Sequence, residues 1–348
     1  MSARAYRRAI DLRHGLVELA HGAGGRSSAQ LIEELFFEAL DNEWLRRRND
    51  QAAFPVSEGR MVMTTDAYVI SPIFFPGGDI GSLAVHGTIN DIAMAGARPL
   101  HLSASFILEE GFPLASLERI ARSMGEAARS AGVAVITGDT KVVERGKADG
   151  VFISTTGIGT VPAGLEISAE RVRPGDCVIV SGSLGDHGVA VMSRRHELQF
   201  ETELVSDSAA LHELVATMVA AVGADLHAMR DPTRGGLAAT LNEIAHQAGV
   251  GFRLEEAAIP VKPAVAAACE LLGLDPLYVA NEGKLVAFVA ARSSGRVLAA
   301  MRAHPLGREA AIIGEAVADE HRFVQMTTGF GGERIVDWLA GEQLPRIC

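Results

Sequence analysis

Gly132-Val133-Ala134-Val135-Ile136-Thr137, followed by Gly138-Asp139, is the stretch that decides the fold class. A short aliphatic, β-branched run that stops at a Gly-Asp pair is typical of a buried strand. Similar runs lie on both sides of it, separated by stretches with helical spacing. They occupy residues 61–65, 151–159, 177–180 and 285–290. Strands that alternate with helices in this way indicate an α/β protein.

Two helices are recognisable from apolar residues that recur every three to four positions. One stripe falls in residues 31–40 and the other in residues 237–248. Turn residues gather around residues 162–164 and 173–176, where Pro and Gly occur close together. We therefore predict three parts, which are an N-terminal domain, a C-terminal domain and a mobile tail. They span residues 1–163, 164–340 and 341–348.

Composition narrows the classes of partner. The 348 residues are 48% hydrophobic and 22% charged, as in an ordinary core-forming chain. The formal net charge of -11 argues against a nucleic-acid surface, although a local cation can still attract a small anion. No apolar stretch reaches the ~18 residues of a membrane span, and no secretory signal is recognisable. Three cysteines without metal-ligand spacing indicate reduced thiols, so we expect a cytoplasmic protein without nucleic-acid or membrane partners.

A glycine-rich loop, His21-Gly22-Ala23-Gly24-Gly25, precedes the first helical stripe. Ser27 and Gln30 follow it at the spacing of a capping box. Glycines let backbone N–H groups close on an anion, and a helix N-terminus adds partial positive charge. The spacing is neither a Walker loop nor a dinucleotide fingerprint. A phosphate cradle and a plain flexible turn therefore explain the loop equally well.

Acidic residues recur beside Gly, Thr or Asn, and they are Asp66, Asp91, Asp139 and Asp231. We expect Asp66 and Asp139 at strand ends, Asp91 in an apolar stretch and Asp231 before a helix. Buried carboxylates need partners, and Mg²⁺ bridging to nucleotide phosphates satisfies several of them at once. Each aspartate taken singly is better explained as a cap or turn residue. The four together indicate a metal–phosphate site.

Three further residues are candidates for chemistry. Lys141 follows Asp139 by two positions, on the same side of an extended segment, where it either neutralises a phosphoryl group or lies free on the surface. Glu282 directly precedes a buried strand and is a candidate base. Cys348 is the last residue printed, after Leu344-Pro345-Arg346-Ile347. Because chain ends are poorly ordered unless docked, this thiol is either a mobile carrier that enters a pocket or an inert end residue.

Taken together, these motifs resemble the HypE family of hydrogenase maturation proteins. This is a family of carbamoyl dehydratases in the PurM-like superfamily, named after aminoimidazole-ribonucleotide (AIR) synthetase. The resemblance runs from the glycine loop to Cys348. The Thr-Asp, Asn-Asp and Gly-Asp-Thr pieces mark the superfamily, and the Pro-Arg-Ile-Cys ending marks the family. The matching segments are residues 21–25, 75–81, 87–91, 138–143, 182–188, 230–236, 275–284 and 344–348.

The resemblance implies a two-domain PurM-like α/β fold. The N-terminal domain pairs its strands across a homodimer, and the C-terminal domain is an α/β sandwich. ATP lies in the cleft with Mg²⁺, which is held by the four aspartates named above. The residues expected at the ATP phosphates are His21, Gly22, Gly24, Gly25, Asn90 and Thr140.

The resemblance also implies the reaction. Cys348 receives a carbamoyl group from the carbamoyltransferase HypF. The enzyme then dehydrates the group to a thiocyanate with ATP, and passes cyanide to the HypC–HypD complex for the iron of [NiFe]-hydrogenase. Phosphorylation of the carbamoyl oxygen makes it a good leaving group. We assign the base to Glu282 and the cation at the phosphoryl group to Lys141 with Mg²⁺.

Two alternatives stay open at this point. One is another enzyme of the superfamily, such as a selenophosphate or AIR synthetase. A selenophosphate synthetase needs a reactive Cys or selenocysteine near its N-terminus, and none precedes Cys177. The other is a non-catalytic carrier that presents a modified thiol to partners. Mg²⁺-dependent ATP turnover separates the carrier from the enzyme, and the acidic residues favour the enzyme.

Overall fold

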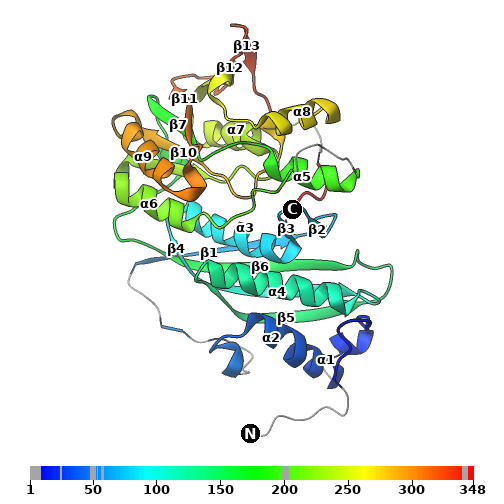
Figure 1. Ribbon diagram of the computed structural model, residues 1–348. Coiled ribbons are helices and arrows are strands. Elements are labelled where there is room, and N and C mark those ends of the chain that lie inside the picture. Colours follow the sequence, from blue (N-terminus) through cyan, green and yellow to red (C-terminus); the bar gives the residue numbers. More distant parts are fainter. Residues whose placement is uncertain are drawn as a thin grey trace.

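The computed structural model describes residues 9–23, 26–47, 52, 54–55, 59–197, 204–338 and 344–348. Two α/β units lie one above the other, each built around one main sheet (Figure 1). The predicted α/β class is confirmed. The predicted boundary near residue 163 falls between the last strand of the first sheet and the first strand of the second. The residue limits of the domains stay a prediction. Within the described ranges, no helix has the length and apolar content to cross a membrane.

The first sheet has four strands in the order β1-β6-β4-β5. They are β1 (Arg60–Tyr68), β6 (Val151–Val161), β4 (Arg98–Glu109) and β5 (Ala134–Val143). β6 is antiparallel to both β1 and β4, and β5 runs parallel to β4. Helices α3 (Ile80–Met94) and α4 (Leu114–Ser130) pack on one face. The face away from these helices carries exposed apolar side chains, including Met63 and Ile107.

Two predicted strand ends are wrong. β1 continues through Asp66 to Tyr68, because its register with β6 is unbroken as far as Ile153. β5 likewise continues through Asp139 to Val143, since it stays paired with β4 over that length. The glycine before Asp139 does not end the strand. A Cβ on Gly138 would lie 2.5 Å from the Ala104 carbonyl oxygen, so glycine allows the close approach of β4 there.

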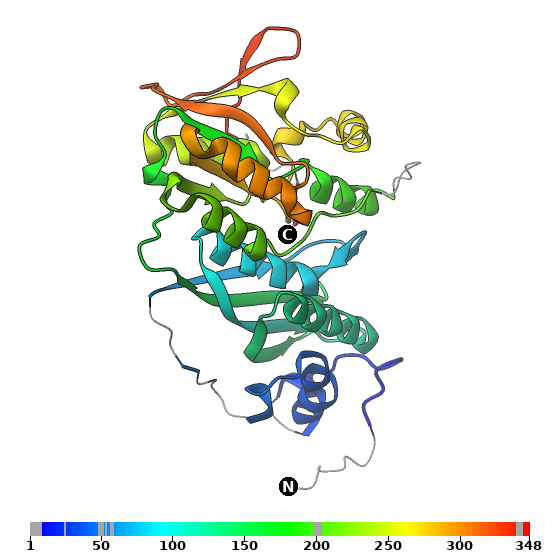
Figure 2. The same ribbon diagram turned by 60° about the vertical axis from the view of Figure 1, so that its left-hand side comes forward.

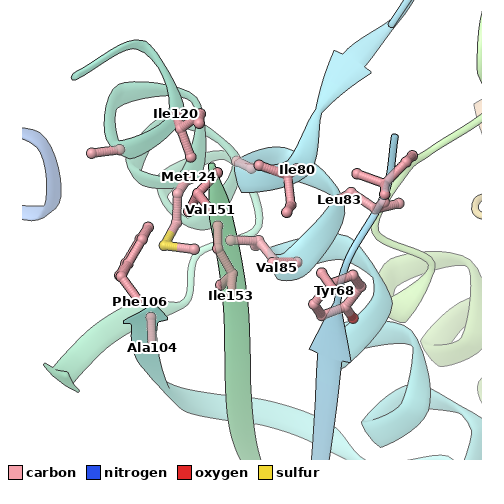
Figure 3. Close-up of a cluster of buried hydrophobic side chains, with 14 of the residues drawn as sticks. Tyr68, Ile80, Leu83, Val85, Ala104, Phe106, Ile120, Met124, Val151 and Ile153 are labelled. Atoms are coloured by element: carbon pink, nitrogen blue, oxygen red, sulfur yellow. The ribbon is translucent and has the colours of Figure 1, made fainter. Parts of the chain in front are cut away.

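The core of the first unit joins the sheet to α3 and α4. Figure 3 shows Val85 of α3 facing Ile153 of the sheet, with Leu83 near Tyr68, and all four residues belong to one core cluster. These side chains are buried, and their packing fixes the position of α3 on the sheet. α3 is buried almost all round because its other side meets the second unit. The residues of α3 that face this second unit therefore lie where the two sheets come closest.

The predicted helix over residues 31–40 is present and forms part of a longer helical stretch. It consists of α1 (Arg26–Leu31), a π-helical turn η2 (Ile32–Phe36) and α2 (Phe37–Leu40). The ring of Phe36 packs on Phe106 of β4 with centroids 4.8 Å apart, which anchors the stretch to the sheet. Because α1 begins at Arg26, Ser27 lies inside its first turn and not at the predicted capping position.

The second sheet has seven strands in the order β13-β12-β9-β11-β7-β10-β8. All neighbours are antiparallel except β12 and β9. The strands are β7 (Asp176–Val180), β8 (Leu226–Arg230), β9 (Gly251–Glu255), β10 (Val286–Ala290), β11 (Ala311–Val317), β12 (Val324–Thr327) and β13 (Glu333–Ile335). Helices α6 (His212–Val222) and α9 (Ala291–Ala303) pack on one face, and α7 (Gly236–Ala248) packs on the other. Figure 2 shows α6 and α9 side by side on their face of the sheet.

The remaining elements are short. They are α5 (Asp186–Arg195), α8 (Pro263–Leu272), β2 (Phe74–Phe75), β3 (Gly78–Asp79) and the single turns η1 (Leu19–Gly22), η3 (Leu45–Arg47), η4 (Ala169–Arg171), η5 (Gly223–Asp225), η6 (Glu256–Ala258), η7 (Pro276–Tyr278) and η8 (Pro305–Gly307). The chain returns from β13 to end between the two units, close to β2, β3 and α5 (Figure 1). This return brings residues 344–348 to the boundary where the candidate site lies.

Candidate active site

A cavity of about 780 Å³ opens between the two units. Its walls come from β1, α3, η4 and the connection between β8 and α7. Asp91 on α3 and Asp231 after β8 both line it, together with Arg230. The apolar part of the wall consists of Val62, Met63, Ile92, Met94, Ile167, Met229 and Ile244. The cavity thus combines an apolar wall with carboxylates supplied by both units.

Carboxylates of the cleft act on one another. Thr64 Oγ1 donates a hydrogen bond of 2.7 Å to Asp91 Oδ2, but burial and the charge of Asp66 raise the pKa of Asp91. Burial and then the charge of Asp91 raise the pKa of Asp231 from 3.8 to about 7, and Asp66 contributes to the same shift. Three predicted metal ligands therefore lie in one electrostatic neighbourhood. Their summed charge favours a cation in the cleft.

Glu282 is the most deeply buried acid of this group. Its side chain lies in the connection between η7 and β10, and the residue is 3% exposed. Burial raises the pKa of Glu282 well above its ordinary value, and the charges of Asp231 and Asp207 raise it further. Its Oε1 has no hydrogen-bond partner among the described residues. A buried carboxyl oxygen without a hydrogen bond lowers the stability of the fold. Such a group is therefore typical of a functional site.

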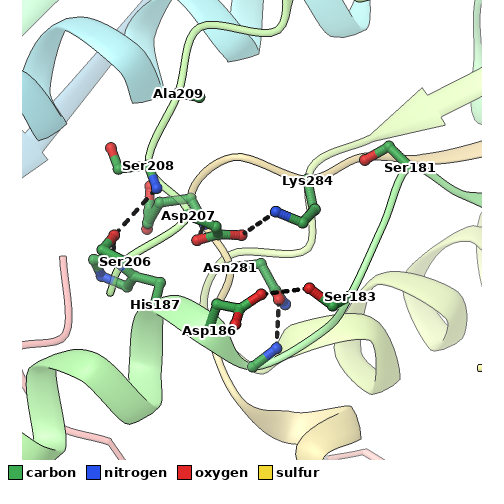
Figure 4. Close-up of polar contacts among 12 residues, drawn as sticks. Ser181, Ser183, Asp186, His187, Ser206, Asp207, Ser208, Ala209, Asn281 and Lys284 are labelled. Carbon is green, nitrogen blue, oxygen red and sulfur yellow. Dashed lines mark hydrogen bonds and ion pairs between the residues drawn. The ribbon is translucent and has the colours of Figure 1, made fainter. Parts of the chain in front are cut away.

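The backbone of Glu282 is held from both sides. Its N–H donates to Asp207 Oδ1 at 3.1 Å, and its carbonyl accepts from Asn90 Nδ2 at 3.1 Å. Asp207 also pairs with Lys284 at 3.2 Å, in the polar cluster drawn in Figure 4. The Asn90 amide is fully used, since it also donates to Ala209 and accepts from Leu211 N–H. A phosphate-binding role for Asn90 stays a prediction, and in this structure the residue positions Glu282.

Cys348 lies in the same neighbourhood. Its thiol is half-buried, and all three cysteines of the chain are free. Burial raises the pKa of this thiol far above its ordinary value. The charge of Glu282 raises the same pKa further, whereas Arg234 lowers it. The sulfur is therefore protonated in this position and lies within electrostatic reach of the candidate base.

The segment that carries Cys348 is docked. Val69 N–H donates to the Cys348 carbonyl and Ser71 N–H to the Arg346 carbonyl, both at 3.1 Å. Ile347 is only 2% exposed and joins the core of the first unit. Residues 341–343 of the predicted tail lie outside the described residues. The mobility of the tail stays a prediction, and the structure gives its docked state.

The other predicted site residues line a second cavity of about 660 Å³ beside β5. It is lined by His21, Gly22, Asp139, Thr140 and Lys141, with apolar side chains from the α1–α2 stretch. Lys141 Nζ is 2.8 Å from Asp139 Oδ2 and holds the pKa of Asp139 below its usual value. Both of these side chains are exposed.

The glycine loop reaches β5 closely. A Cβ on Gly22 would lie 2.7 Å from the backbone nitrogen of Val142, so a side chain there would push the loop away. His21 Nδ1 accepts a hydrogen bond of 2.9 Å from Glu18 N–H, and burial lowers the pKa of His21. Gly24 and Gly25 lie outside the described residues, so their predicted contact with phosphates stays a prediction.

Within one protomer the two groups of predicted residues are separate. β1 carries Asp66 and β5 carries Asp139 and Lys141, and these are opposite edge strands of the four-stranded sheet. Three strand spacings separate β1 from β5, which is a distance of about 14 Å. No set of three or more His, Cys, Asp or Glu side chains in the described part of the chain is arranged to hold a metal ion. The four-aspartate metal set accordingly stays a prediction, with Asp139 apart from the other three.

Sequence reasoning missed several residues of the site. Asp207 and Arg195 occur in polar segments that look like ordinary surface, so no local pattern singles them out. His187 was missed as well, and its buried ring lies 2.9 Å from the carbonyl oxygen of Ile347. Its place in the matching segment 182–188 was the only available signal.

The chain is similar to known proteins over nearly its whole length. The N-terminal and C-terminal domain models of the AIR synthase related protein family match residues 48–161 and 173–327. The carbamoyl dehydratase HypE of Bradyrhizobium diazoefficiens is 72% identical over 345 residues, which cover 99% of this chain and 100% of the relative. A crystal structure of the hydrogenase maturation protein HypE in complex with ATP has a TM-score of 0.92 at 50% identity, covering 95% of this chain and 99% of that one. A HypE–HypF complex has a TM-score of 0.78 at 48% identity, covering 89% and 99%. The chain therefore belongs to the HypE family of hydrogenase maturation proteins, within the AIR synthase related, PurM-like superfamily.

Proposed function

We propose that this protein dehydrates a carbamoyl group carried on Cys348 to a thiocyanate, at the expense of ATP, to supply cyanide for the iron of [NiFe]-hydrogenase. The single observation that carries this proposal is the docked position of Cys348. Backbone hydrogen bonds from Val69 and Ser71 hold this end of the chain between the two units, and the charge of buried Glu282 reaches the Cys348 thiol, whose pKa it raises. The HypE relatives are named carbamoyl dehydratases, and one HypE structure is a complex with ATP.

The reaction balances as R–S–C(=O)–NH₂ + ATP → R–S–C≡N + ADP + phosphate. The carbamoyl oxygen attacks the γ-phosphorus and takes the phosphoryl group, which converts a poor leaving group into phosphate. The C–O bond then breaks, and the electrons of the N–H bonds form the C≡N triple bond. Both amide protons must leave the nitrogen during the two steps. A base beside the sulfur of Cys348 is therefore required.

Glu282 suits that role. Its Oε1 has no hydrogen-bond partner among the described side chains, so it is free to accept an amide proton. The pKa of Glu282 is raised by burial and by Asp231, so its carboxylate is a stronger base than an exposed glutamate. Hydrogen bonds from Asn90 and to Asp207 hold its backbone in place. The base is thus positioned by both units at once.

We assign a magnesium ion to the acids of the cleft. The charge of Asp66 contributes to the raised pKa values of Asp91 and Asp231, so negative charge is concentrated there. Oxygen ligands of this kind are those that Mg²⁺ prefers. When bound there with ATP, the ion neutralises charge on the phosphates during transfer. We assign these three residues, with Asp139, to the metal and His21, Gly22, Gly24, Gly25 and Thr140 to the phosphates.

The separation of Asp139 from the other acids favours a homodimer. The sheet face away from α3 and α4 exposes Met63 by 74% and Ile107 by 41%, and such apolar strand positions are normally covered. Asp139 and Lys141 share this face, since their register partners on β4 are Ser105 and Ile107. Pairing of two such faces would bring Asp139 and Lys141 of one protomer toward the cleft of the other. Lys141 would then neutralise the transferring phosphoryl group.

The proposed partners follow from the reaction. HypF supplies the carbamoyl group, in keeping with the structure of a HypE–HypF complex. The HypC–HypD complex accepts the cyanide, and a cytoplasmic location suits three free thiols. The acceptor complex and the location stay predictions.

Replacing Cys348 with Ala tests the proposal. We expect the variant to bind ATP normally and to gain no cyano group after incubation with the carbamoyl donor and ATP, as measured by intact mass. Cys177→Ala removes another free thiol and is the matched control, which we expect to be modified as the wild type is. A cyano group on the Cys348→Ala protein would contradict the proposal.

A further inference from the structure

We propose that Arg195 and His187, both on α5, are positioning residues that clamp the main chain of residues 345–347 and keep Cys348 docked between the two units. This inference rests on the proposed function only in taking Cys348 as the acceptor of the carbamoyl group. The clamp sets the balance between the docked tail, in which dehydration takes place, and the released tail, which meets its partners.

Arg195 supplies most of the contacts. Its Nη1 donates to the Pro345 carbonyl at 2.8 Å, and its Nη2 donates to the Arg346 carbonyl at 2.9 Å. Its Nε donates to the Ser71 carbonyl at 2.8 Å. One guanidinium therefore joins the tail to the segment on which the tail docks. No carboxylate among the described residues forms an ion pair with Arg195, so its charge is directed at these carbonyls.

His187 makes the next contact along the tail. The residue is fully buried, and its Nε2 lies 2.9 Å from the Ile347 carbonyl. A carbonyl oxygen only accepts, so Nε2 carries the proton and donates. Nδ1 then accepts from Ser206 Oγ at 2.8 Å. The neutral imidazole is thus held in one tautomer by the tail on one side and by Ser206 on the other.

The same hydrogen-bonded segment also positions the base. Ser206 Oγ accepts from Ser208 N–H at 3.1 Å, and Asp207 between them accepts from Glu282 N–H. Figure 4 shows His187 beside Ser206 and Asp207 facing Lys284. His187 therefore bridges the docked tail and the segment that holds Glu282. Docking of the tail and placement of the base share one set of contacts.

The clamp recognises only main-chain carbonyls, since its partners are the oxygens of Pro345, Arg346 and Ile347. None of these contacts involves the sulfur or its substituent. A free thiol, a carbamoyl thioester and a thiocyanate can therefore dock with the same backbone geometry. The clamp therefore docks the tail in the same way whichever group the sulfur carries.

The rate of Cys348 alkylation by iodoacetamide measures how often the tail leaves its docked position. The full-length protein is treated, quenched and cut after glutamate, and mass spectrometry then quantifies the modified peptide 343–348. We expect Arg195→Gln to raise the alkylation rate by about tenfold or more, because at least one charge-assisted hydrogen bond is lost. Arg195→Lys keeps the charge without the fork and should give an intermediate rate. Arg194→Gln removes a neighbouring exposed arginine and should leave the rate unchanged.

Wild-type alkylation rates in folded Arg195→Gln would overturn the clamp. If that variant does not fold, His187→Gln decides by the same criterion, with folding checked by thermal unfolding. In carbamoylated protein, we also expect Arg195→Gln to slow single-turnover cyanation without changing the KM for ATP, which a general loss of structure would change. The alkylation assay needs neither HypF nor ATP. Failure of the clamp proposal is therefore distinguishable from failure of the proposed function. In the second case the wild type itself gains no cyano group.

Discussion

Replacing Asp231 with Asn tests whether the ionised Asp231 carboxylate destabilises the folded protein. Burial and Asp91 raise the pKa of Asp231 from 3.8 to about 7. Below pH 4 the carboxyl is protonated in both the folded and the unfolded protein and costs no stability. As pH rises from 3.8 to about 7, only the unfolded chain ionises freely, so the wild type loses stability, and the loss is complete above pH 7.

The size of the effect follows from the shift. About three pKa units correspond to roughly 4 kcal/mol. Asp231 is partly exposed to the cavity, and solvent screening reduces this figure to about 2 kcal/mol. Without Mg²⁺, we therefore expect Asp231→Asn to be more stable than the wild type by about 2 kcal/mol at pH 8 and by less than about 1 kcal/mol at pH 5.

Urea unfolding in a chelating buffer at the two pH values measures this difference. Addition of ATP with Mg²⁺ should reverse the order, because a ligand that binds only the folded wild type stabilises it. Glu320→Gln, which removes an exposed carboxylate, is the control and should show no such pH dependence. Equal destabilisation of Asp231→Asn at pH 5 and pH 8 would refute the reasoning. Ionisation of Asp231 in the wild type would then have no effect on the free energy of unfolding.

Two further predictions concern the residues beside β5. Asp139→Asn should cripple ATP hydrolysis at low Mg²⁺, because a metal ligand is lost, and unchanged hydrolysis there would remove Asp139 from the metal set. Mixing Lys141→Ala with Cys348→Ala protein tests whether Lys141 acts across the dimer. After subunit exchange, we expect about a quarter of wild-type cyanation, since half of the dimers are mixed and each has one complete site. No recovery would indicate that Lys141 acts within its own protomer or has no part in the reaction.

The elements with strong local patterns were predictable. The helix expected over residues 237–248 is α7 (Gly236–Ala248), and the strand expected over residues 151–159 is β6 (Val151–Val161). Strand ends were harder, since β1 and β5 run past Asp66 and Asp139. Polar residues in a strand do not end it when a neighbouring strand still offers hydrogen-bond partners, and that neighbour is unknown from the local sequence.

Candidate site residues could be chosen from the sequence one at a time, and their roles stay predictions. Asp91, Asp231, Glu282 and Cys348 were each chosen from their immediate neighbours in the sequence. The structure places Asp91 and Asp231 on the wall of one cavity, and the charge of Asp231 reaches both Glu282 and Cys348. Asp139 had the same local signal, yet it lies with Lys141 on the far edge strand. The order of strands in the sheet made that difference, and residue spacing along the chain carries little information about it.

The amino-acid sequence by itself determined the α/β class, the positions of the main elements and the types of residue available for chemistry, because periodicity and motif residues are local properties. Only the tertiary structure decided which of these residues meet. It places the Asn90 amide in a hydrogen bond to the Glu282 carbonyl. It also places Arg195 and His187 in hydrogen bonds to the carbonyls of the tail. Such contacts join positions more than a hundred residues apart, so they exist only once the two units have packed together.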